Sequence, residues 1–200
     1  MRTSIAVANY LTIVSGLPRS GTSMMMRMLE LGGLPVLTDG ERTADDDNPN
    51  GYYEFEAVKQ TREDASWLRD SEGKAVKMIY RLLYDLPAGR EYRILFMMRQ
   101  LEEVLASQRV MLRRKGMSDD AITDDQMAAL FRADLDKFRS WVAAQPHIAL
   151  IDVSYNQVQE NPAGEVRRIN EFLGGFLDEA AMVQVVDDAL YRNRAAPLPR

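Results

Sequence analysis

The feature that most constrains the fold is the stretch LTIVSGLPRSGTSMMMRMLE at residues 11–30. It continues an apolar, β-branched run over residues 10–15, which predicts a buried strand. Residues 23–33 predict a helix that ends at a pair of glycines. A glycine-rich loop joins the two, so backbone N–H groups and a helix N-terminus are expected just beyond the end of the first strand. This order of elements predicts an anion-binding loop.

The loop departs from the phosphate-binding pattern G-x-x-x-x-G-K-[ST] at one position. Gly16, Gly21 and Ser23 fall in register, but Thr22 stands in place of the lysine. The nearest cation is Arg19, inside the loop. Because an arginine presents a planar fork of donors that suits tetrahedral oxyanions, Arg19 is expected to do the electrostatic work of the missing lysine. The loop side chains that can donate to an anion are Arg19, Ser20, Thr22 and Ser23.

Strands and helices alternate along the chain, as its apolar periodicity indicates. The predicted strands are residues 10–15, 34–37, 75–80, 92–98 and 147–153. The predicted helices are residues 23–33, 52–70, 102–115 and 178–190, with two more that begin at Thr123 and Pro162. This alternation predicts an α/β fold, with a mainly parallel sheet and helices on both faces. Together with the loop, it indicates a single domain over residues 1–200 with the three-layer architecture of P-loop NTPases.

Capping signals support the later helices. Thr123 and Gln126 have the spacing of a capping box, and Asn161 precedes Pro162 at the start of another helix. The helix after Thr123 is predicted to carry an inner stripe of Met127, Leu130, Phe131, Leu135, Phe138, Trp141 and Val142. Ligands of parallel sheets bind beyond the carboxyl ends of the strands. The residues expected at those ends are the Gly16 loop, Tyr80, Arg99 and Ser154.

Composition excludes several classes of protein. The 200 residues include no cysteine, which excludes a disulfide scaffold and thiolate chemistry. No apolar run approaches the roughly 20 residues that span a bilayer, so no membrane partner is expected. The net charge of -5 argues against a nucleic-acid partner but allows a small anionic ligand, which needs only a few aimed cations. A cytoplasmic location is the simplest expectation.

Three segments resemble those of a known family, the sulfotransferases. SGLPRSGTSMM is similar to their phosphosulfate-binding loop, roughly [apolar]-x-G-x-P-[RK]-S-G-T-[ST]. FMMRQLEEVLASQRVML, residues 96–112, resembles their strand–Arg–x–x–x–x–Val–x–x–Ser segment, with Arg99 and Ser107 in the matching places. In that family these two residues hold the 3′-phosphate of the donor, 3′-phosphoadenosine 5′-phosphosulfate (PAPS). The resemblance assigns to donor binding Gly16, Pro18, Arg19, Ser20, Gly21, Thr22, Ser23, Arg99, Ser107 and Tyr155.

Tyr155 enters this set through a third segment. VSYNQVQENPAGEVRRINEFLG, residues 153–174, resembles the family's strand-end tyrosine, followed by an acidic-Pro segment and a helix that ends Phe-Leu-Gly. The resemblance implies that Tyr155 packs near the adenine; the alternative is an ordinary packed tyrosine. The family's C-terminal Arg-Lys-Gly loop over the 3′-phosphate is absent as such, and Arg192 and Arg194 are the candidates to replace it.

The resemblance leaves more than one candidate for the residue that takes the acceptor's proton. Many family members use a histidine, but His147 lies at the start of a predicted strand, opposite the strand ends, and is expected to be structural. Other members use a glutamate soon after the loop, where this chain has Glu54 and Glu56. Glu54 is preferred because it is expected to open the helix at 52–70. Lys77 matches a strand lysine near the substrate or the leaving phosphate.

The resemblance implies a PAPS-dependent sulfotransferase that uses no metal, with Glu54, Arg19 and Lys77 as catalytic residues. Its acceptor would be a hydroxyl or amine of a small molecule or glycan, whose identity the sequence does not fix. One alternative is an ATP-dependent P-loop kinase, in which Asp152 ends IALID like a Walker-B acid and Ser23 binds Mg²⁺. Another is a nucleotide-binding protein that kept the fold and lost its base.

Overall fold

A computed structural model describes residues 8–40, 51–114 and 123–186 of the chain. These residues build one five-stranded sheet in the order β2-β3-β1-β4-β5, and every neighbouring pair is parallel. The strands are β1 (Tyr10–Gly16), β2 (Val36–Leu37), β3 (Ala75–Lys77), β4 (Glu91–Met98) and β5 (Ile148–Ser154). β1 is central and buried along its whole length, as expected for a parallel strand that is covered on both faces.

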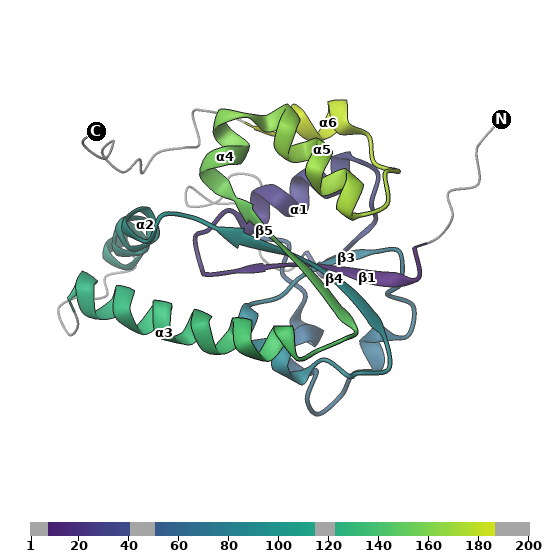
Figure 1. Ribbon diagram of the computed structural model, residues 1–200, viewed down its shortest axis with the longest axis horizontal. Helices are drawn as coiled ribbons and strands as arrows, with labels where there is room; N and C mark the ends of the chain where they lie inside the picture. Colours follow the sequence, from purple (N-terminus) through teal and green to yellow (C-terminus); the bar gives the residue numbers. More distant parts are fainter. Residues whose placement is uncertain (1–7, 41–50, 115–122, 187–200) are drawn as a thin grey trace.

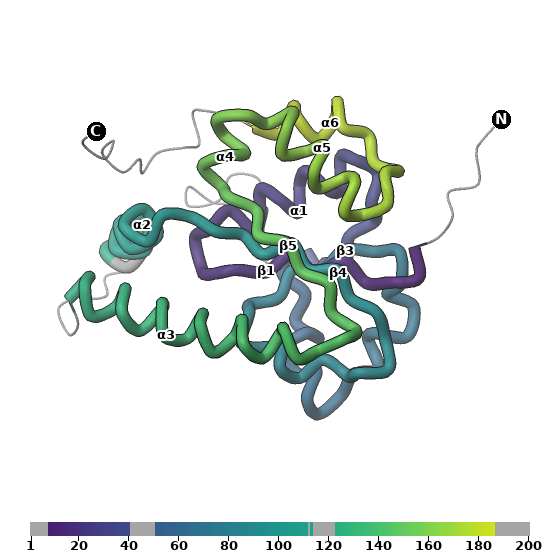
Figure 2. The backbone as a smooth tube through the Cα atoms, in the orientation of Figure 1, coloured from purple at the N-terminus to yellow at the C-terminus, as the bar shows by residue number. Residues whose placement is uncertain are grey.

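Helices cover both faces of the sheet (Figure 1), which confirms the predicted three-layer α/β fold. The α-helices are α1 (Thr22–Leu31), α2 (Leu101–Arg114), α3 (Asp124–Ala143), α4 (Tyr155–Glu160), α5 (Pro162–Phe172) and α6 (Glu179–Val183). The described part of the chain also contains three short 3-10 helices, η1 (Glu56–Gln60), η2 (Ser66–Leu68) and η3 (Tyr80–Asp85). The backbone trace shows α1 and α4–α6 on one side of the sheet and α3 on the other (Figure 2). Among the described residues, no helix is long and apolar enough to cross a membrane.

Each face of the sheet has its own apolar core, because successive side chains of a strand point to opposite faces. Val14 of β1 packs with α1, α4, α5 and α6. Ile13, its neighbour, packs instead with the 3-10 helices and α3. On that second face Phe138 of α3 is 1% exposed, and its ring stacks on Phe96 of β4 with 5.1 Å between centroids.

The predicted helix starts after Thr123 and Asn161 are confirmed. The Thr123 hydroxyl accepts a hydrogen bond from the N–H of Gln126 at 3.3 Å, and the Gln126 side chain accepts from the N–H of Thr123 at 3.0 Å. Asn161 caps α5 by accepting from the N–H of Gly164 at 3.2 Å, with Pro162 in the first turn. The inner stripe of α3 was wrong at Leu130, whose side chain is 56% exposed.

The prediction of a helix over residues 52–70 was wrong, because one distant and one local side chain hydrogen-bond to the backbone of this segment. The carbonyl of Tyr52 accepts a hydrogen bond from Lys77, and Tyr53 has a left-handed φ of 52°. Further on, the Asp64 carboxylate accepts from the N–H of Ser66 at 2.8 Å and closes a turn. The segment consequently contains the separate short helices η1 and η2.

Two other boundaries differ from the expectation. β3 ends at Lys77 rather than at residue 80, because the chain turns at once into η3. The helix expected at 178–190 is α6, which ends at Val183; residues 187–190 lie outside the described residues.

Candidate active site

The glycine-rich loop leaves the carboxyl end of β1 and is pressed against β4. Gly16 pairs with Met97 of β4 and has a φ of 146°; a Cβ on it would lie 2.5 Å from the Met97 carbonyl oxygen. Gly21 precedes α1 with a φ of 97°, and a Cβ there would lie 2.4 Å from the Tyr155 ring. Arg19 adopts a φ of 68°, which costs a non-glycine residue about 1 kcal/mol or more. The loop is therefore held in a conformation that this close packing dictates.

Gly21→Ala is expected to lower the free energy of unfolding by about 2 to 3 kcal/mol, since it adds both a left-handed alanine and a clash with the Tyr155 ring. Gly33→Ala is the matched control, because Gly33 has a similar φ of 93° and no atom within 4 Å of the added Cβ. We expect a loss of about 1 kcal/mol there, measured by denaturant unfolding. Equal losses in both variants would contradict the packing of Gly21 on Tyr155.

Ser20 serves the turn of the loop itself. Its hydroxyl donates to the Leu17 carbonyl at 2.7 Å, and its N–H donates to the same oxygen at 3.2 Å. The residue is buried. The expected contact between the Ser20 hydroxyl and an anion thus stays a prediction, while its role in shaping the loop is visible.

The structure brings Arg19, Arg99 and Ser107 together from three different elements. Arg19 Nε donates to Ser107 Oγ at 2.9 Å, which links the loop to α2. Arg99, just past the end of β4, donates from Nη1 to the Arg19 carbonyl at 3.2 Å. All three residues therefore lie at the carboxyl ends of the central strands β1 and β4, where parallel sheets bind ligands. Two guanidinium groups, a hydroxyl and a glycine-rich loop in one place suit a ligand with more than one anionic group.

Arg99 is further held by a buried ion pair that the sequence analysis did not single out. Arg99 Nε lies 2.7 Å from Glu103 Oε2, and the two side chains are 8% and 1% exposed. Asn156 Nδ2 donates to the other carboxylate oxygen at 3.3 Å. The Arg99 guanidinium also covers the ring of Tyr155, 4.4 Å from its centroid. The sequence could have predicted this pair from the Arg-x-x-x-Glu spacing at the start of a helix, since residues four apart are neighbours on a helix.

Tyr155 lies beneath the loop. Its side chain is 5% exposed, with the Arg99 guanidinium over its ring and Gly21 against the ring edge. A packed tyrosine of this kind supports the loop and the arginine together. The predicted contact between Tyr155 and adenine remains a prediction.

Lys77 and Ser23 meet at a single carbonyl oxygen, that of Tyr52. Lys77 ends β3, and its register partner in β1 is Val14, two residues before Gly16. Its ammonium group donates to the Tyr52 carbonyl, and Ser23 Oγ, in the first turn of α1, donates to the same oxygen at 3.5 Å. Lys77 is therefore placed beside the start of α1, and its catalytic role stays a prediction.

Glu54 lies two residues after this carbonyl, outside any helix or strand and not at the helix start that the sequence analysis expected. Its own carbonyl accepts from Thr38 Oγ1 at 3.0 Å and from the Asp39 N–H at 3.1 Å, so the segment is tied to the end of β2. The Glu54 side chain is half-buried, whereas Glu56 is exposed and forms an ion pair with Lys59.

Tyr53 anchors the same segment to α1. Its hydroxyl donates to Glu30 Oε2 at 2.6 Å, and Arg27 binds that carboxylate oxygen at 2.8 Å. Burial, followed by the hydrogen bond to Glu30, raises the pKa of Tyr53 to about 12. A neutral tyrosine can donate this bond throughout the physiological pH range. The segment that carries Glu54 is consequently fixed on both sides.

Two of the remaining candidates, His147 and Asp152, lie away from the loop. His147 is buried at the opposite end of the sheet, where its ring centroid lies 5.9 Å from that of Tyr92, as expected for a structural histidine.

Asp152 lies on β5, separated from β1 by β4, and forms an ion pair with Arg139 at 2.9 Å. It is therefore not beside Ser23, as a Walker-B acid would be. Arg192 and Arg194 lie outside the described residues.

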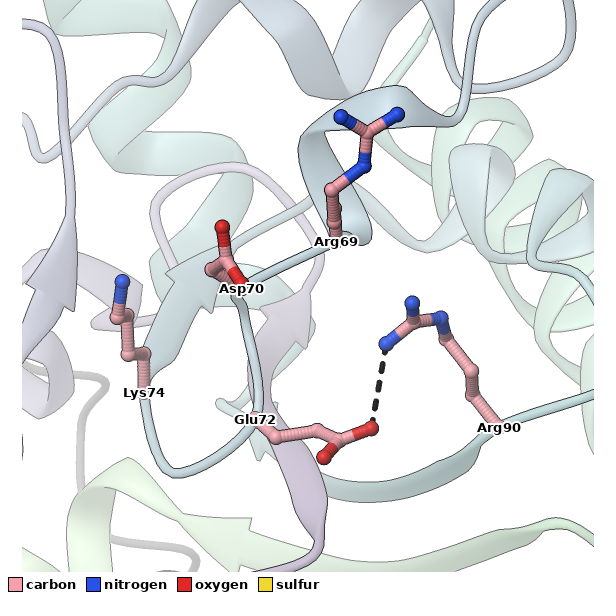
Figure 3. A pocket seen from close by; sticks show the side chains of 5 residues that line it. All are labelled: Arg69, Asp70, Glu72, Lys74 and Arg90. Atoms are coloured by element: carbon pink, nitrogen blue, oxygen red, sulfur yellow. Dashed lines mark hydrogen bonds and ion pairs between the residues drawn. The ribbon is translucent and has the colours of Figure 1, made fainter.

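A charged depression of about 500 Å³ lies at the amino ends of the strands and not at the loop. It is lined by Arg69, Asp70, Glu72, Lys74 and Arg90 (Figure 3). Lys74 and Arg90 immediately precede β3 and β4, and Arg90 pairs with Glu72 at 3.3 Å. Its lining mixes three basic with two acidic side chains, and none of these belongs to the predicted site.

A family model described as "Sulfotransferase family" matches residues 37–179. This span is well over half of the 200 residues and contains β4, α2 and β5. The chain therefore belongs to the sulfotransferase family, as the resemblance of its two motifs implied. No curated protein matches the sequence.

Solved sulfotransferases share the fold. A mouse sulfotransferase complexed with PAP gives a TM-score of 0.56 at 14% identity, covering 96% of this chain and 70% of that one. The sulfotransferase domain of the Synechococcus PCC 7002 olefin synthase gives 0.53 at 14%, covering 98% and 84%. Retinol dehydratase, in complex with androsterone and the inactive cofactor PAP, gives 0.51 at 15%, covering 90% of this chain. This chain spans only 64% of the retinol dehydratase chain. At these identities the likeness establishes the fold alone, that of the P-loop type.

Proposed function

We propose that the chain is an enzyme that transfers a sulfuryl group from PAPS to a hydroxyl or amine of a small-molecule or glycan acceptor. One observation carries the proposal: Arg19 of the loop bonds to Ser107 of α2, while Arg99 bonds to the backbone of Arg19. These contacts join the two motifs that resemble the donor-binding segments of sulfotransferases. A donor with anionic groups at both its 5′ and 3′ ends suits such a pair of adjacent cation sites.

In this proposal the loop binds the 5′-phosphosulfate. Its backbone N–H groups and the start of α1 face the anion, and Arg19 and Lys77 supply positive charge. Groups fixed in advance by the fold need no reorganisation when charge develops on the transferred group and the leaving phosphate. The rigid packing of Gly16 and Gly21 supports this role.

Arg99 and Ser107 bind the 3′-phosphate in the same proposal. Arg99 leaves the end of β4, whereas Ser107 lies two turns into α2, and both reach Arg19. Tyr155 backs Arg99 from below, and in this proposal it packs near the adenine. The solved mouse sulfotransferase and retinol dehydratase, both complexed with PAP, support a donor of this type. The androsterone in the second complex supports a small-molecule acceptor.

The chemistry would be an in-line substitution at sulfur. The acceptor oxygen or nitrogen forms a bond to sulfur as the bond between sulfur and the 5′-phosphate oxygen breaks, which releases 3′,5′-adenosine diphosphate (PAP). Glu54 would take the acceptor proton, since it is half-buried and its segment is fixed by Tyr53 and Thr38. Arg19 and Lys77 would stabilise the charge on the leaving phosphate.

Glu54→Gln is expected to lower kcat for transfer from labelled PAPS, in the presence of a panel of hydroxyl and amine acceptors, by about a hundredfold. Binding of PAP should change less than twofold, because the amide keeps the shape of the carboxyl group. Glu56→Gln is the matched comparison and should leave kcat unchanged. A loss in Glu56→Gln with normal turnover in Glu54→Gln would move the base to Glu56. Tight PAP binding without transfer to any acceptor would favour a nucleotide-binding protein that lacks catalysis.

A further inference from the structure

A carboxylate is buried against the cation site. Glu103, in the first turn of α2, is 1% exposed in its side chain, and each of its two oxygens has a protein partner. A carboxylate loses several kcal/mol of hydration on burial, so its burial here requires strong compensating contacts. Arg99 Nε and Asn156 Nδ2 are two such contacts, at 2.7 and 3.3 Å.

Different parts of the Arg99 guanidinium group make different contacts within the protein. Nε faces Glu103, and Nη1 faces the carbonyl of Arg19. The flat side of the group lies over the Tyr155 ring. A flexible arginine side chain has about 2 kcal/mol of rotamer entropy, which these contacts remove before any ligand arrives. The orientation of Arg99 is therefore fixed by the protein.

Glu103 also joins three segments that form the site. It lies on α2, its cation partner follows β4, and its amide partner Asn156 lies on α4. Through Arg99 the link continues to the backbone of Arg19 in the loop. The neighbouring Glu102 lies on the same turn of α2 but is exposed, so it is not buried in the site as Glu103 is.

We propose that Glu103 is a positioning residue that orients Arg99 toward the 3′-phosphate of the donor, with Asn156 holding the carboxylate in turn. This inference rests on the proposed function, because it assumes that Arg99 binds this phosphate. The inference goes beyond the proposed function, because it names a residue that controls ligand preference without touching the ligand. The preference in question is for a nucleotide with a 3′-phosphate over one without it.

The test is a comparison of dissociation constants for two ligands that differ only by the 3′-phosphate, PAP and adenosine 5′-monophosphate. Wild-type protein is expected to bind PAP at least tenfold more tightly. Glu103→Ala should reduce this preference about tenfold and leave the affinity for the monophosphate within twofold. Glu103→Gln keeps an oxygen that can accept from Arg99 Nε, so it should recover the preference to within threefold of wild type. Glu102→Ala is the matched control and should leave both constants unchanged.

Two further variants test the connection through Arg99. Asn156→Ala should reduce the preference for PAP about threefold. This variant tests the same link if Glu103→Ala fails to fold. In an Arg99→Ala background, Glu103→Ala should have no further effect on the preference, because the residue acts through that arginine. A wild-type preference in Glu103→Ala, or an equal loss for both ligands, would overturn the proposal. A wild-type protein that binds both ligands alike would instead overturn the proposed function, and this proposal with it.

Discussion

Arg19→Ala is expected to lower kcat/KM for sulfuryl transfer by about a thousandfold. Arg19 is the cation within the loop and donates to Ser107 at 2.9 Å, so its loss removes charge next to both expected anionic groups of the donor. Removal of one aimed donor from such a site costs about 3 to 4 kcal/mol of transition-state stabilisation. The measurement is the initial rate of PAP release from PAPS with a fixed acceptor.

Arg132→Ala controls for the loss of a positive charge as such. Arg132 is exposed on α3, on the opposite face of the sheet from α1. Its replacement should leave the rate of transfer unchanged. Alanine at position 19 can adopt the same left-handed φ as arginine, so the unfolding free energy should change little. An Arg19→Ala protein with wild-type kcat/KM would remove Arg19 from the site.

Phe138→Ala is expected to lower the free energy of unfolding by about 3 to 5 kcal/mol. The Phe138 ring is buried between β4 and η3, with Phe96 at 5.1 Å and Tyr80 at 5.8 Å from its centroid. Its removal would leave a cavity in the core that holds α3 against the sheet. Leu130→Ala, on the same helix but 56% exposed, should change stability by less than about 0.5 kcal/mol. Similar losses in the two variants, measured by denaturant unfolding, would contradict this placement of α3.

Much of the fold was predictable because its strands are apolar runs next to clear caps and glycines. β1 with its loop, β4, and the capping box at Thr123 all follow from short-range patterns, and the structure contains them as expected. The segment 52–70 could not be predicted in this way. The start of this segment is held by Lys77, which is distant in sequence and donates to the Tyr52 carbonyl. Leu130 fits the helical stripe, yet it is exposed in the structure, which a helical pattern alone does not reveal.

The candidate site was likewise predictable in part. Arg19, Arg99 and Ser107 could be proposed from motif spacing, since each follows a strand or lies on a predicted helix. Their mutual contacts depend on the strand order, in which β4 lies beside β1. Glu103 was missed because an Arg–Glu pair at spacing four is common on exposed helix surfaces. Only its burial and its link to Asn156 distinguish it from such a pair.

The most direct test of PAPS binding at this site is a thermal-shift titration of the purified chain with PAP in the absence of metal. At one hundred times the dissociation constant, a ligand adds about 2.7 kcal/mol of stability. In a protein of this size that corresponds to a rise in Tm of about 5 °C or more. We expect this rise with PAP alone and a smaller one with ATP and Mg²⁺. Stabilisation by ATP and Mg²⁺ only, with no shift by PAP, would contradict this expectation.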